Sequence, residues 1–301
     1  MELPKKRTSF FPSASEDAHA AKLHADSPQT QSPSYALSFL DTDFMMRDEL
    51  RPVRLQLELL KPEIIQMELN IASTVVIFGS ARIKDSDTAK ACLEKRKAEA
   101  EKHPDAPDVA RKLQIAQRDL DNSRYYDEAR RLARMIASAG QDSNGAGCVV
   151  STGGGPGIME AANRGAHDVD AKSIGMNIVL PHEQAPNPYI TPELSFQFHY
   201  FAIRKMHFLI RAKALIAFPG GFGTMDELFE TLTLVQTKKI APMPILLFGK
   251  SFWQKAINFD ALVDAGVVSP EDLDLFHFVE TAQQGWDLLN QSDSGFRTTG
   301  P

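Results

Sequence analysis

The sequence predicts an α/β protein built on a doubly wound parallel sheet with helices on both faces. Three features of the chain predict this class. Short apolar runs of strand length alternate with longer segments of helical periodicity. Two of these runs open directly into glycine-rich turns, and each turn leads into a helix start. Such alternation is typical of a parallel sheet whose strands are joined by right-handed crossovers.

Composition limits the classes of protein that the chain can represent. With 301 residues, 43% of them hydrophobic, it can bury a sizeable core in one or two domains. A formal net charge of −6 argues against broad nucleic-acid binding, which needs a basic surface. The sequence has no run of about 18 apolar residues, so we expect no membrane span.

The N-terminus and the cysteines indicate a cellular compartment. Lys5, Lys6 and Arg7 are not followed by an apolar segment, so we expect no secretory signal. Cys92 and Cys148 are the two cysteines of the sequence, and neither has a partner at metal-ligand spacing. We therefore expect a reduced, cytoplasmic protein that uses no metal and no cofactor.

The two ends of the chain lack the strand–helix alternation. Residues 1–42 are rich in Ser, Pro, Ala, Asp and His without periodicity, which predicts a disordered or loosely attached arm. Apolar residues from Leu50 to Leu69 recur at helical steps, and Pro62 should divide this segment into two helices. We expect a single domain over residues 43–290 and a frayed tail over residues 291–301.

The first convincing strand covers Thr74 to Phe78, which is apolar and β-branched, as in a strand buried on both faces. Gly79, Ser80 and Arg82 follow at its carboxyl end, where open α/β sheets place ligands. Ser80 could donate to a phosphate or a sugar, and Arg82 could supply charge. An ordinary tight turn with a surface arginine explains the same residues.

A charged segment over residues 85–122 then interrupts the alternation. It is rich in Lys, Glu, Ala and Arg and is broken near Pro104 and Pro107, which predicts a helical insertion of two solvated helices. A separate helix from Tyr125 to Ala139 should pack on the sheet and end at Gly140.

A second strand, Gly147 to Thr152, opens onto a glycine turn from Gly153 to Gly157 and a helix start. The turn is not a P-loop, because no Lys-Ser or Lys-Thr ends it. Its spacing also departs from the G-x-G-x-x-G dinucleotide fingerprint. A mononucleotide or a sugar phosphate fits better. His167, on the following helix, is interpreted as a surface or packing residue.

Further strands are expected from Ser173 to Leu180 and from Pro244 to Phe248. Between them, the segment from Phe196 to Phe208 is dense in aromatic residues and places Arg204 and His207 nearly one helical turn apart. An arginine among aromatic side chains could bind an anion or stack on a base. Core aromatics with an arginine at their rim explain the same pattern.

The chain is organised around the stretch from Phe218 to Glu230. An apolar strand leads into it, and Pro219 ends that strand because proline has no N–H for a sheet ladder. Gly220, Gly221 and Gly223 then permit a sharp turn and leave the backbone bare of side chains.

A helix should begin at Thr224, which forms a T-x-x-E capping-box pattern with Glu227. The free N–H groups of the turn and the positive end of the helix dipole would then make an anion site. Asp226 and Glu227 would lie in the first helical turn, where they either only cap the helix or take part in chemistry. Because both glycine turns should lie on the carboxyl edge of the sheet, we expect one shared pocket.

Three motifs in this order resemble the Lonely Guy family, whose members are often described as lysine decarboxylase-like. They are G-G-G-P-G-I-M-E-A-A-N-R-G-A from Gly153, R-K-M from Arg204 and P-G-G-F-G-T-M-D-E from Pro219. The resemblance covers roughly Val75 to Leu289. It implies a Rossmann-like fold, usually in a homodimer or a larger assembly of dimers.

The resemblance also implies an activity. Members of the family are phosphoribohydrolases, which cleave the N-glycosidic bond of a nucleoside 5′-monophosphate to a free base and ribose 5-phosphate. Their substrates include AMP and cytokinin riboside monophosphates, so the resemblance implies an AMP nucleosidase or an enzyme of cytokinin activation. The N-terminal arm and the segment over residues 85–122 depart from the short plant members and resemble the longer bacterial ones.

Specific residues acquire roles through the same resemblance. Arg204 matches the catalytic arginine of the R-K motif, and Glu227 matches the catalytic glutamate that ends the P-G-G-x-G-T-x-x-E motif. The residues implied in substrate binding are Gly79, Ser80, Gly153, Gly154, Gly155, Gly157, Met159, Glu160, Lys205, Gly220, Gly221, Gly223, Thr224 and Asp226.

The chemistry explains why such residues would be needed. Cleavage of a glycosidic bond builds positive charge on the sugar ring, which a nearby carboxylate stabilises. We expect Glu227 to be ionised, since a helix N-terminus favours the charged form. Arg204 stays protonated, so it would hold the phosphate or the base, or assist the leaving base. The alternative is a non-catalytic nucleotide or phosphate-cofactor binding protein. A lysine decarboxylase is disfavoured, because the chain has no S-x-H-K context for pyridoxal phosphate.

Overall fold

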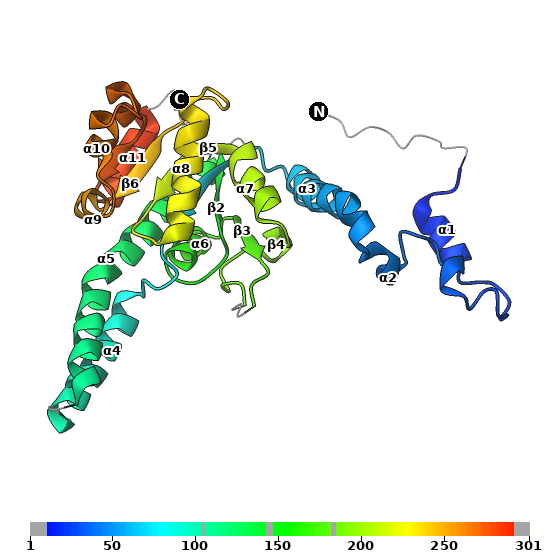
Figure 1. Ribbon diagram of the computed structural model, residues 1–301, viewed down its shortest axis with the longest axis horizontal. Helices are drawn as coiled ribbons and strands as arrows, with labels where there is room; N and C mark the ends of the chain where they lie inside the picture. Colours follow the sequence, from blue (N-terminus) through cyan, green and yellow to red (C-terminus); the bar gives the residue numbers. More distant parts are fainter. Residues whose placement is uncertain (1–10, 104–105, 143–146, 182–184, 292–301) are drawn as a thin grey trace. The chain divides into compact units, whose positions relative to one another are not determined.

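A computed structural model describes residues 11–103, 106–142, 147–181 and 185–291 (Figure 1). The chain divides into two compact units, residues 1–57 and residues 58–301. What the sequence predicts for residues 1–10 and for the tail beyond residue 291 lies outside the described residues.

The described part of the first unit consists of short helices joined by turns. They are α1 (Ala14–Ala20), the 3-10 helix η1 (Pro33–Tyr35), α2 (Thr42–Met45), η2 (Asp48–Leu50) and the start of α3 (Arg51–Glu68). A capping box begins α1, because the N–H of Glu16 donates to Ser13 Oγ (3.2 Å) and the N–H of Ser13 donates to the Glu16 carboxylate (2.7 Å). No residue of α1 or α2 is buried. The segment expected to be a loose arm thus contains local, exposed helices.

Helix α3 runs unbroken through Pro62, so the predicted division at this proline is wrong. A proline within a helix has no N–H for the carbonyl four residues earlier, which here belongs to Glu58. Nε2 of His207 lies 3.2 Å from this carbonyl oxygen and donates to it. A tertiary hydrogen bond therefore replaces the helical one that the proline removes.

Seven parallel strands form one sheet in the order β4-β3-β2-β1-β5-β6-β7. They are β1 (Ser73–Phe78), β2 (Cys148–Thr152), β3 (Ser173–Ile178), β4 (Ser195–Phe198), β5 (Ala212–Ala217), β6 (Ile245–Phe248) and β7 (His277–Val279). In the central strand, Val75 and Ile77 enter the core on one face, whereas Val76 and Phe78 enter the core on the other. The predicted doubly wound, Rossmann-like α/β class is confirmed.

Helices cover both faces of this sheet (Figure 1). One core contains side chains from α5 (Pro107–Asp142), α6 (Ile158–His167) and α11 (Ala282–Gln291). The other contains side chains from the end of α3, α7 (Phe201–Ile210), α8 (Phe222–Gln236), α9 (Lys250–Ala256) and α10 (Phe259–Asp264). The short 3-10 helices η3 (Pro192–Leu194) and η4 (Pro270–Leu275) precede β4 and β7. The sheet is buried on both faces, which is why its inner strands are rich in apolar residues.

Two outer strands were not predicted from the sequence. β4 lies inside the aromatic stretch, and its side chains alternate: Phe196 and Phe198 are buried, whereas Ser195 and Gln197 are exposed. β7 has only three residues. Helix α7 begins just after β4, at Phe201. The aromatic stretch therefore joins a strand to the helix that carries Arg204.

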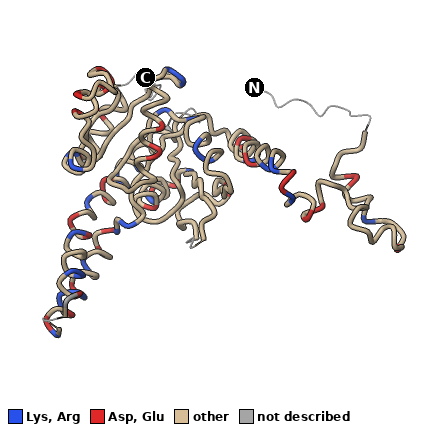
Figure 2. Tube along the Cα trace, viewed as in Figure 1, with Lys and Arg blue, Asp and Glu red and all other residues tan. Residues whose placement is uncertain are grey.

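The charged segment forms α4 (Ser86–Lys102) and the first half of α5, which pack against each other. α5 is a single 36-residue helix, so the expected separate helix from Tyr125 is wrong. No proline or glycine separates the two halves, and the second half buries Ala129, Leu132 and Ile136 on the sheet. Figure 2 shows charges of both signs along α4 and α5. Arg96 with Glu99 (2.6 Å) and Lys97 with Glu94 (2.9 Å) are two of their ion pairs.

Candidate functional site

The turns that follow β1, β2 and β5 meet at the carboxyl edge of the sheet. The N–H of Ser80, after β1, donates to the carbonyl of Pro219 after β5 (3.0 Å), and the N–H of Ile158, after β2, donates to the carbonyl of Ser80 (3.2 Å). β1 pairs with β2 on one side and with β5 on the other. The chain order thus reverses beside β1, and this reversal is where doubly wound sheets form ligand crevices.

The turn after β2 needs glycine because its backbone is crowded. Gly154 has φ of +75°, and a Cβ there would clash with the side chain of Asn177. Gly157 has φ of +71°, and a Cβ there would clash with the backbone of Ser80 and Ala81. Positive φ and close packing therefore explain these two glycines without a ligand. A Cβ at Gly79 would likewise meet Ile158.

A buried polar network that the sequence did not reveal supports this turn. Nδ2 of Asn187 donates to the carbonyls of Gly154 and Gly155 (both 3.1 Å) and to Oδ1 of Asn163 (2.9 Å). Oδ1 of Asn163 also accepts from Oγ1 of Thr152 (2.7 Å). The signal in the sequence was a polar Asn163 among small apolar residues on the inner face of α6. Its fully buried amide fixes the path of the glycine turn.

Helix α8 begins at Phe222 with Gly221 as its N-cap, so the prediction of Thr224 as the cap is wrong. Glycines let the chain enter the helix earlier, and Thr224 instead packs its side chain against Gly220. Asp226 and Glu227 consequently lie beyond the first turn, which contains no acidic residue. The capping box predicted for Thr224 and Glu227 does not form.

Gly221 and Gly223 differ from the other glycines of the site. A Cβ at either would meet nothing within 4 Å, and neither has a positive φ. Within the described residues no side chain caps the N-terminus of α8, whose first residue, Phe222, is 95% exposed. The start of α8 is therefore uncapped and exposed at Phe222, so an anion can approach the positive end of the helix dipole.

Glu227 is only 5% exposed although it carries a carboxylate. Burial raises its pKa to about 7, against the opposing charges of Lys205 and Arg204. At a pKa of about 7 the carboxylate is only partly ionised near neutral pH, so the helix dipole does not hold Glu227 in its charged form as expected. Glu227 sits well past the first turn, where the dipole has faded, and desolvation outweighs it. The fully buried side-chain atoms that lack a hydrogen-bond partner include neither oxygen of Glu227.

Arg204 lies one turn into α7 and is also poorly solvated. Its Nε is fully buried and has no hydrogen-bond partner among the described residues. Burial lowers the pKa of Arg204, and the carboxylates of Glu227 and Asp226 oppose this change. The guanidinium carbon lies 5.1 Å from the ring centroid of Phe201 and 5.5 Å from that of Phe208. Aromatic rings thus replace part of its water shell, while an N–H remains available to an acceptor.

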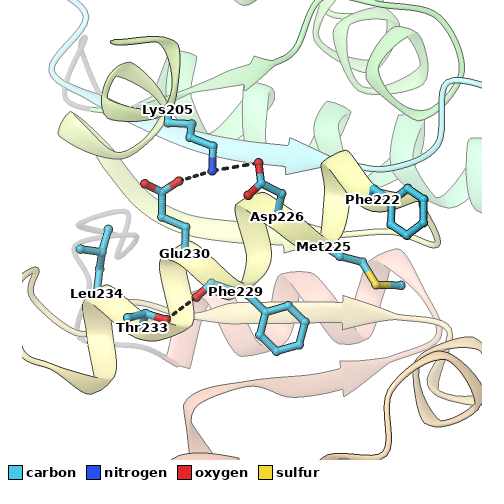
Figure 3. Close-up of a pocket in the computed structure, with 8 residues that line it drawn as sticks. All are labelled: Lys205, Phe222, Met225, Asp226, Phe229, Glu230, Thr233 and Leu234. Atoms are coloured by element: carbon cyan, nitrogen blue, oxygen red, sulfur yellow. Dashed lines mark hydrogen bonds and ion pairs between the residues drawn. The ribbon is translucent and has the colours of Figure 1, made fainter. Parts of the chain in front are cut away.

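Lys205, the neighbour of Arg204, joins α7 to α8. Its Nζ lies 2.9 Å from a carboxylate oxygen of Asp226 and 2.9 Å from one of Glu230 (Figure 3). Burial lowers its pKa, but these two hydrogen bonds outweigh burial and the pKa is raised. Lys205 and Asp226, both expected to bind substrate, therefore bind each other. They line an open hollow of about 540 Å³ on the outer face of α8, together with Phe222, Met225, Phe229, Glu230, Thr233 and Leu234.

A second hollow, of about 600 Å³, lies beside the turn after β1. Gly157 and Glu160 are the expected binding residues that line it, with Arg82, Lys84 and Arg118 among the others. Glu160 accepts from the hydroxyl of Tyr126 (2.8 Å), and Oγ of Ser80 accepts from the N–H of Arg82 (3.1 Å).

The expected site residues thus fall into two groups on one edge of the sheet. Arg204, Lys205, Asp226 and Glu227 share the face covered by α7 and α8. The glycine turn after β2, with Met159 and Glu160, begins α6 on the other face. The turn after β1 is hydrogen-bonded to the ends of both groups. Arg204 and Glu227 line neither hollow.

Fold and topology define the chain as a Rossmann-like α/β protein with glycine turns at its switch point. The sequence profile of the family described as "Possible lysine decarboxylase" matches residues 159–289. A rice (Oryza sativa subsp. japonica) protein named probable cytokinin riboside 5′-monophosphate phosphoribohydrolase is 28% identical over 179 residues, which are 56% of this chain and 76% of the relative. An Arabidopsis thaliana cytokinin riboside 5′-monophosphate phosphoribohydrolase is 29% identical over 171 residues, which again are 56% of this chain and 76% of the relative. Over the residues that these matches cover, the chain is similar to the Lonely Guy family.

Solved structures match the chain at a lower level of similarity. The molybdenum cofactor carrier protein of Chlamydomonas reinhardtii is 17% identical, with a TM-score of 0.42 over 73% of this chain and 96% of that protein. That similarity is too low to support an inference about function. Among the described residues, no cluster of His, Cys, Asp and Glu could hold a metal ion. No described helix combines the length and apolarity needed to cross a bilayer.

Proposed function

We propose that the protein is a nucleoside 5′-monophosphate phosphoribohydrolase, which hydrolyses AMP or a cytokinin riboside monophosphate to the free base and ribose 5-phosphate. The observation that carries this proposal is that two poorly solvated groups of opposite charge, Arg204 and Glu227, influence each other's pKa at the switch-point edge. Glu227 has a pKa of about 7, and Arg204 has an unpartnered Nε. Both the poorly solvated carboxylate and the unpartnered guanidinium N–H are unfavourable in the free protein. A ligand that is anionic at one end and gains positive charge at the other would stabilise both groups.

The proposed mechanism gives each group a separate task. The uncapped N-terminus of α8, with Gly221 and Gly223, holds the 5′-phosphate by its free N–H groups. The carboxylate of Glu227 stabilises the positive charge that develops on the ribose ring and orients the attacking water. Arg204 donates to the phosphate or to the departing base. Phosphate binding then supplies the energy that aligns the sugar with Glu227.

The alternative is a nucleotide-binding protein without catalytic activity. The low exposure of Glu227 favours it, because a carboxylate that stays protonated and covered would not stabilise a cationic sugar. This alternative predicts that AMP raises the melting temperature of the protein while no base is released.

We extend the proposal to the state of assembly, and expect a homodimer. Large apolar side chains are exposed on the two helices that carry the site: Met206 (49%) and Ile210 (48%) on α7, and Phe222 (95%) and Phe229 (38%) on α8. A second copy of the chain would cover them. Light scattering after size-exclusion chromatography tests this expectation, and a monomer at micromolar concentration would refute it.

One experiment tests the proposed activity. Purified protein is incubated with a panel of nucleoside 5′-monophosphates that includes AMP and a cytokinin riboside monophosphate, and free base is measured by chromatography. We expect base release from at least one of them, and loss of release in Glu227→Gln. Glu193→Gln, an exposed change of the same chemical kind, is the control and should retain full activity. Base release that is equal in wild type and Glu227→Gln would remove Glu227 from the mechanism.

A further inference from the structure

The carboxylate of Glu58, on α3, closes the N-terminus of the helix that carries Arg204. Its two oxygens accept from the backbone N–H groups of His199 (2.7 Å) and Tyr200 (3.1 Å). Tyr200 is the N-cap residue of α7, and its own side chain makes no capping hydrogen bond within the described part of the chain. A carboxylate from another helix therefore binds the N–H of the N-cap residue, as the glutamate of a capping box does, and it also complements the helix dipole.

The backbone of Glu58 contacts the same helix a second time. Its carbonyl, freed by Pro62, accepts from Nε2 of His207, which is 3% exposed. One residue of α3 thus fixes both the first turn of α7 and a point further along it. The proline is what makes the second contact available, because an ordinary residue at position 62 would occupy that carbonyl.

Glu63, one and a half turns further along α3, reinforces this attachment. Its carboxylate pairs with the guanidinium of Arg211, at the end of α7, and lies 3.3 Å from Nδ1 of His207. Nε of Arg211 donates in addition to the carbonyl of Ile71 (3.1 Å). Both ends of α7 are therefore attached to the segment from Glu58 to Ile71.

This attachment bears on the site because Arg204 lies in the first turn of α7. Its own N–H donates to the carbonyl of Tyr200 (3.2 Å), the residue that Glu58 holds. The Arg204 side chain has no hydrogen bond from Nε to a described residue that could place it instead. Its position relative to Glu227 therefore depends on the backbone of this turn.

We propose that Glu58 is a positioning residue of the site: by closing the first turn of α7 it sets the place of Arg204, and through it the productive geometry of a bound nucleoside monophosphate. This inference rests on the proposed function. It assigns to α3, which precedes the sheet, a role in activity and not only in stability.

The experiment compares Glu58→Ala, Glu58→Gln and the control Glu68→Ala, which removes an exposed carboxylate from the same helix. Four quantities are measured: kcat for AMP, KM for AMP, the Kd of AMP, and amide hydrogen exchange over residues 199–204. All measurements are made at least 15 °C below the melting temperature of each variant, so that every sample is folded. Loss of a helix cap corresponds to roughly a five- to tenfold change in an equilibrium constant.

For Glu58→Ala we expect exchange over residues 199–204 to rise about tenfold and kcat/KM to fall by a similar factor. Glu58→Gln keeps one acceptor oxygen, so it should recover part of both losses, and Glu68→Ala should match wild type. A wild-type kcat/KM and Kd in folded Glu58→Ala would overturn the inference while leaving the proposed function intact.

Failure of the proposed function and failure of the inference about Glu58 give different results. If wild type binds AMP without releasing base, the proposed activity fails, and the Kd of AMP decides on Glu58. If wild type neither binds nor cleaves any nucleotide of the panel, the proposed function and the inference are both overturned.

Discussion

Arg204 and Glu227 each shift the pKa of the other toward its charged form, although no hydrogen bond in the described part of the chain joins them. Burial acts in the opposite sense on both, lowering the pKa of Arg204 and raising that of Glu227 to about 7. The two side chains come from neighbouring helices, α7 and α8, that a lysine and two carboxylates tie together. Two poorly solvated groups of opposite charge that no hydrogen bond joins are typical of a functional site.

Replacing Glu227 by Gln should stabilise the protein in a pH-dependent way. Its folded pKa of about 7 exceeds the ordinary pKa of 4.5 for an exposed glutamate, so the folded state loses stability as pH rises from about 4.5 to about 7. A shift of this size corresponds to at most about 3 kcal/mol at pH 8. We expect Glu227→Gln to melt several degrees higher than wild type at pH 8 and to differ little at pH 4.5. Equal melting temperatures at both pH values would show that Glu227 is better solvated than its burial indicates.

The activity of the wild type should follow the ionisation of the same carboxylate. If the ionised form of Glu227 stabilises the sugar cation, kcat/KM rises about tenfold per pH unit below pH 7 and levels off above it. The profile is measured from about pH 5.5 to 8.5 with AMP. A pH-independent kcat/KM over this range would contradict a role for the ionised carboxylate.

Arg204→Met should separate binding from stability. The substitution removes a buried guanidinium whose Nε lacks a partner, so the folded protein should lose little stability and can gain about 1 kcal/mol. AMP should bind at least tenfold more weakly, because the acceptor on the ligand loses a charged donor. Chemical unfolding and calorimetric titration measure the two effects. A large loss of stability with unchanged affinity would make Arg204 a structural residue.

Alanine substitutions at two glycines should have opposite effects. Gly154→Ala introduces a Cβ at φ of +75° and against Asn177, so it should cost about 2 kcal/mol or more of folding free energy. Gly223→Ala adds a methyl group in open space within α8 and should stabilise the helix by up to about 1 kcal/mol. We expect Gly223→Ala nonetheless to weaken AMP binding, because the methyl group obstructs the approach of a phosphate. Undiminished affinity would place the phosphate elsewhere.

The inner part of the sheet could be predicted from the sequence because both of its faces are buried. β1, β2, β3, β5 and β6 lie in short runs rich in apolar residues, and the length and composition of these runs locate them. β4 and β7 are short outer strands with partly exposed residues, so their patterns are weak. Pro62 was wrongly interpreted because the partner of the freed carbonyl, His207, lies far away in sequence.

Contacts between residues far apart in sequence also limited the prediction of the site. The glycine turns were located from their spacing, and the roles of Arg204 and Glu227 stay predictions. The helix start was misplaced at Thr224, since sequence favours a capping side chain over the bare Gly221 that begins α8. The ionisation of Glu227 was also missed, because desolvation depends on which helices pack around a residue. Asn163 and Asn187 form their network only when α6 and the loop after β3 fold together.

The central position of β1 also governs the order in which the site can be made. Thr74 pairs with Val149 on one side and with Ala212 on the other. The pairing with Ala212 therefore brings together two residues that lie far apart in the sequence. Closure of so long a loop carries a large entropic cost and makes folding slow. During synthesis, α4 and α5 can fold locally as they leave the ribosome. The crevice beside β1 can form only after β5 has been synthesised. A nascent chain that ends before residue 212 would therefore expose an unpaired edge of β1, where another strand could pair.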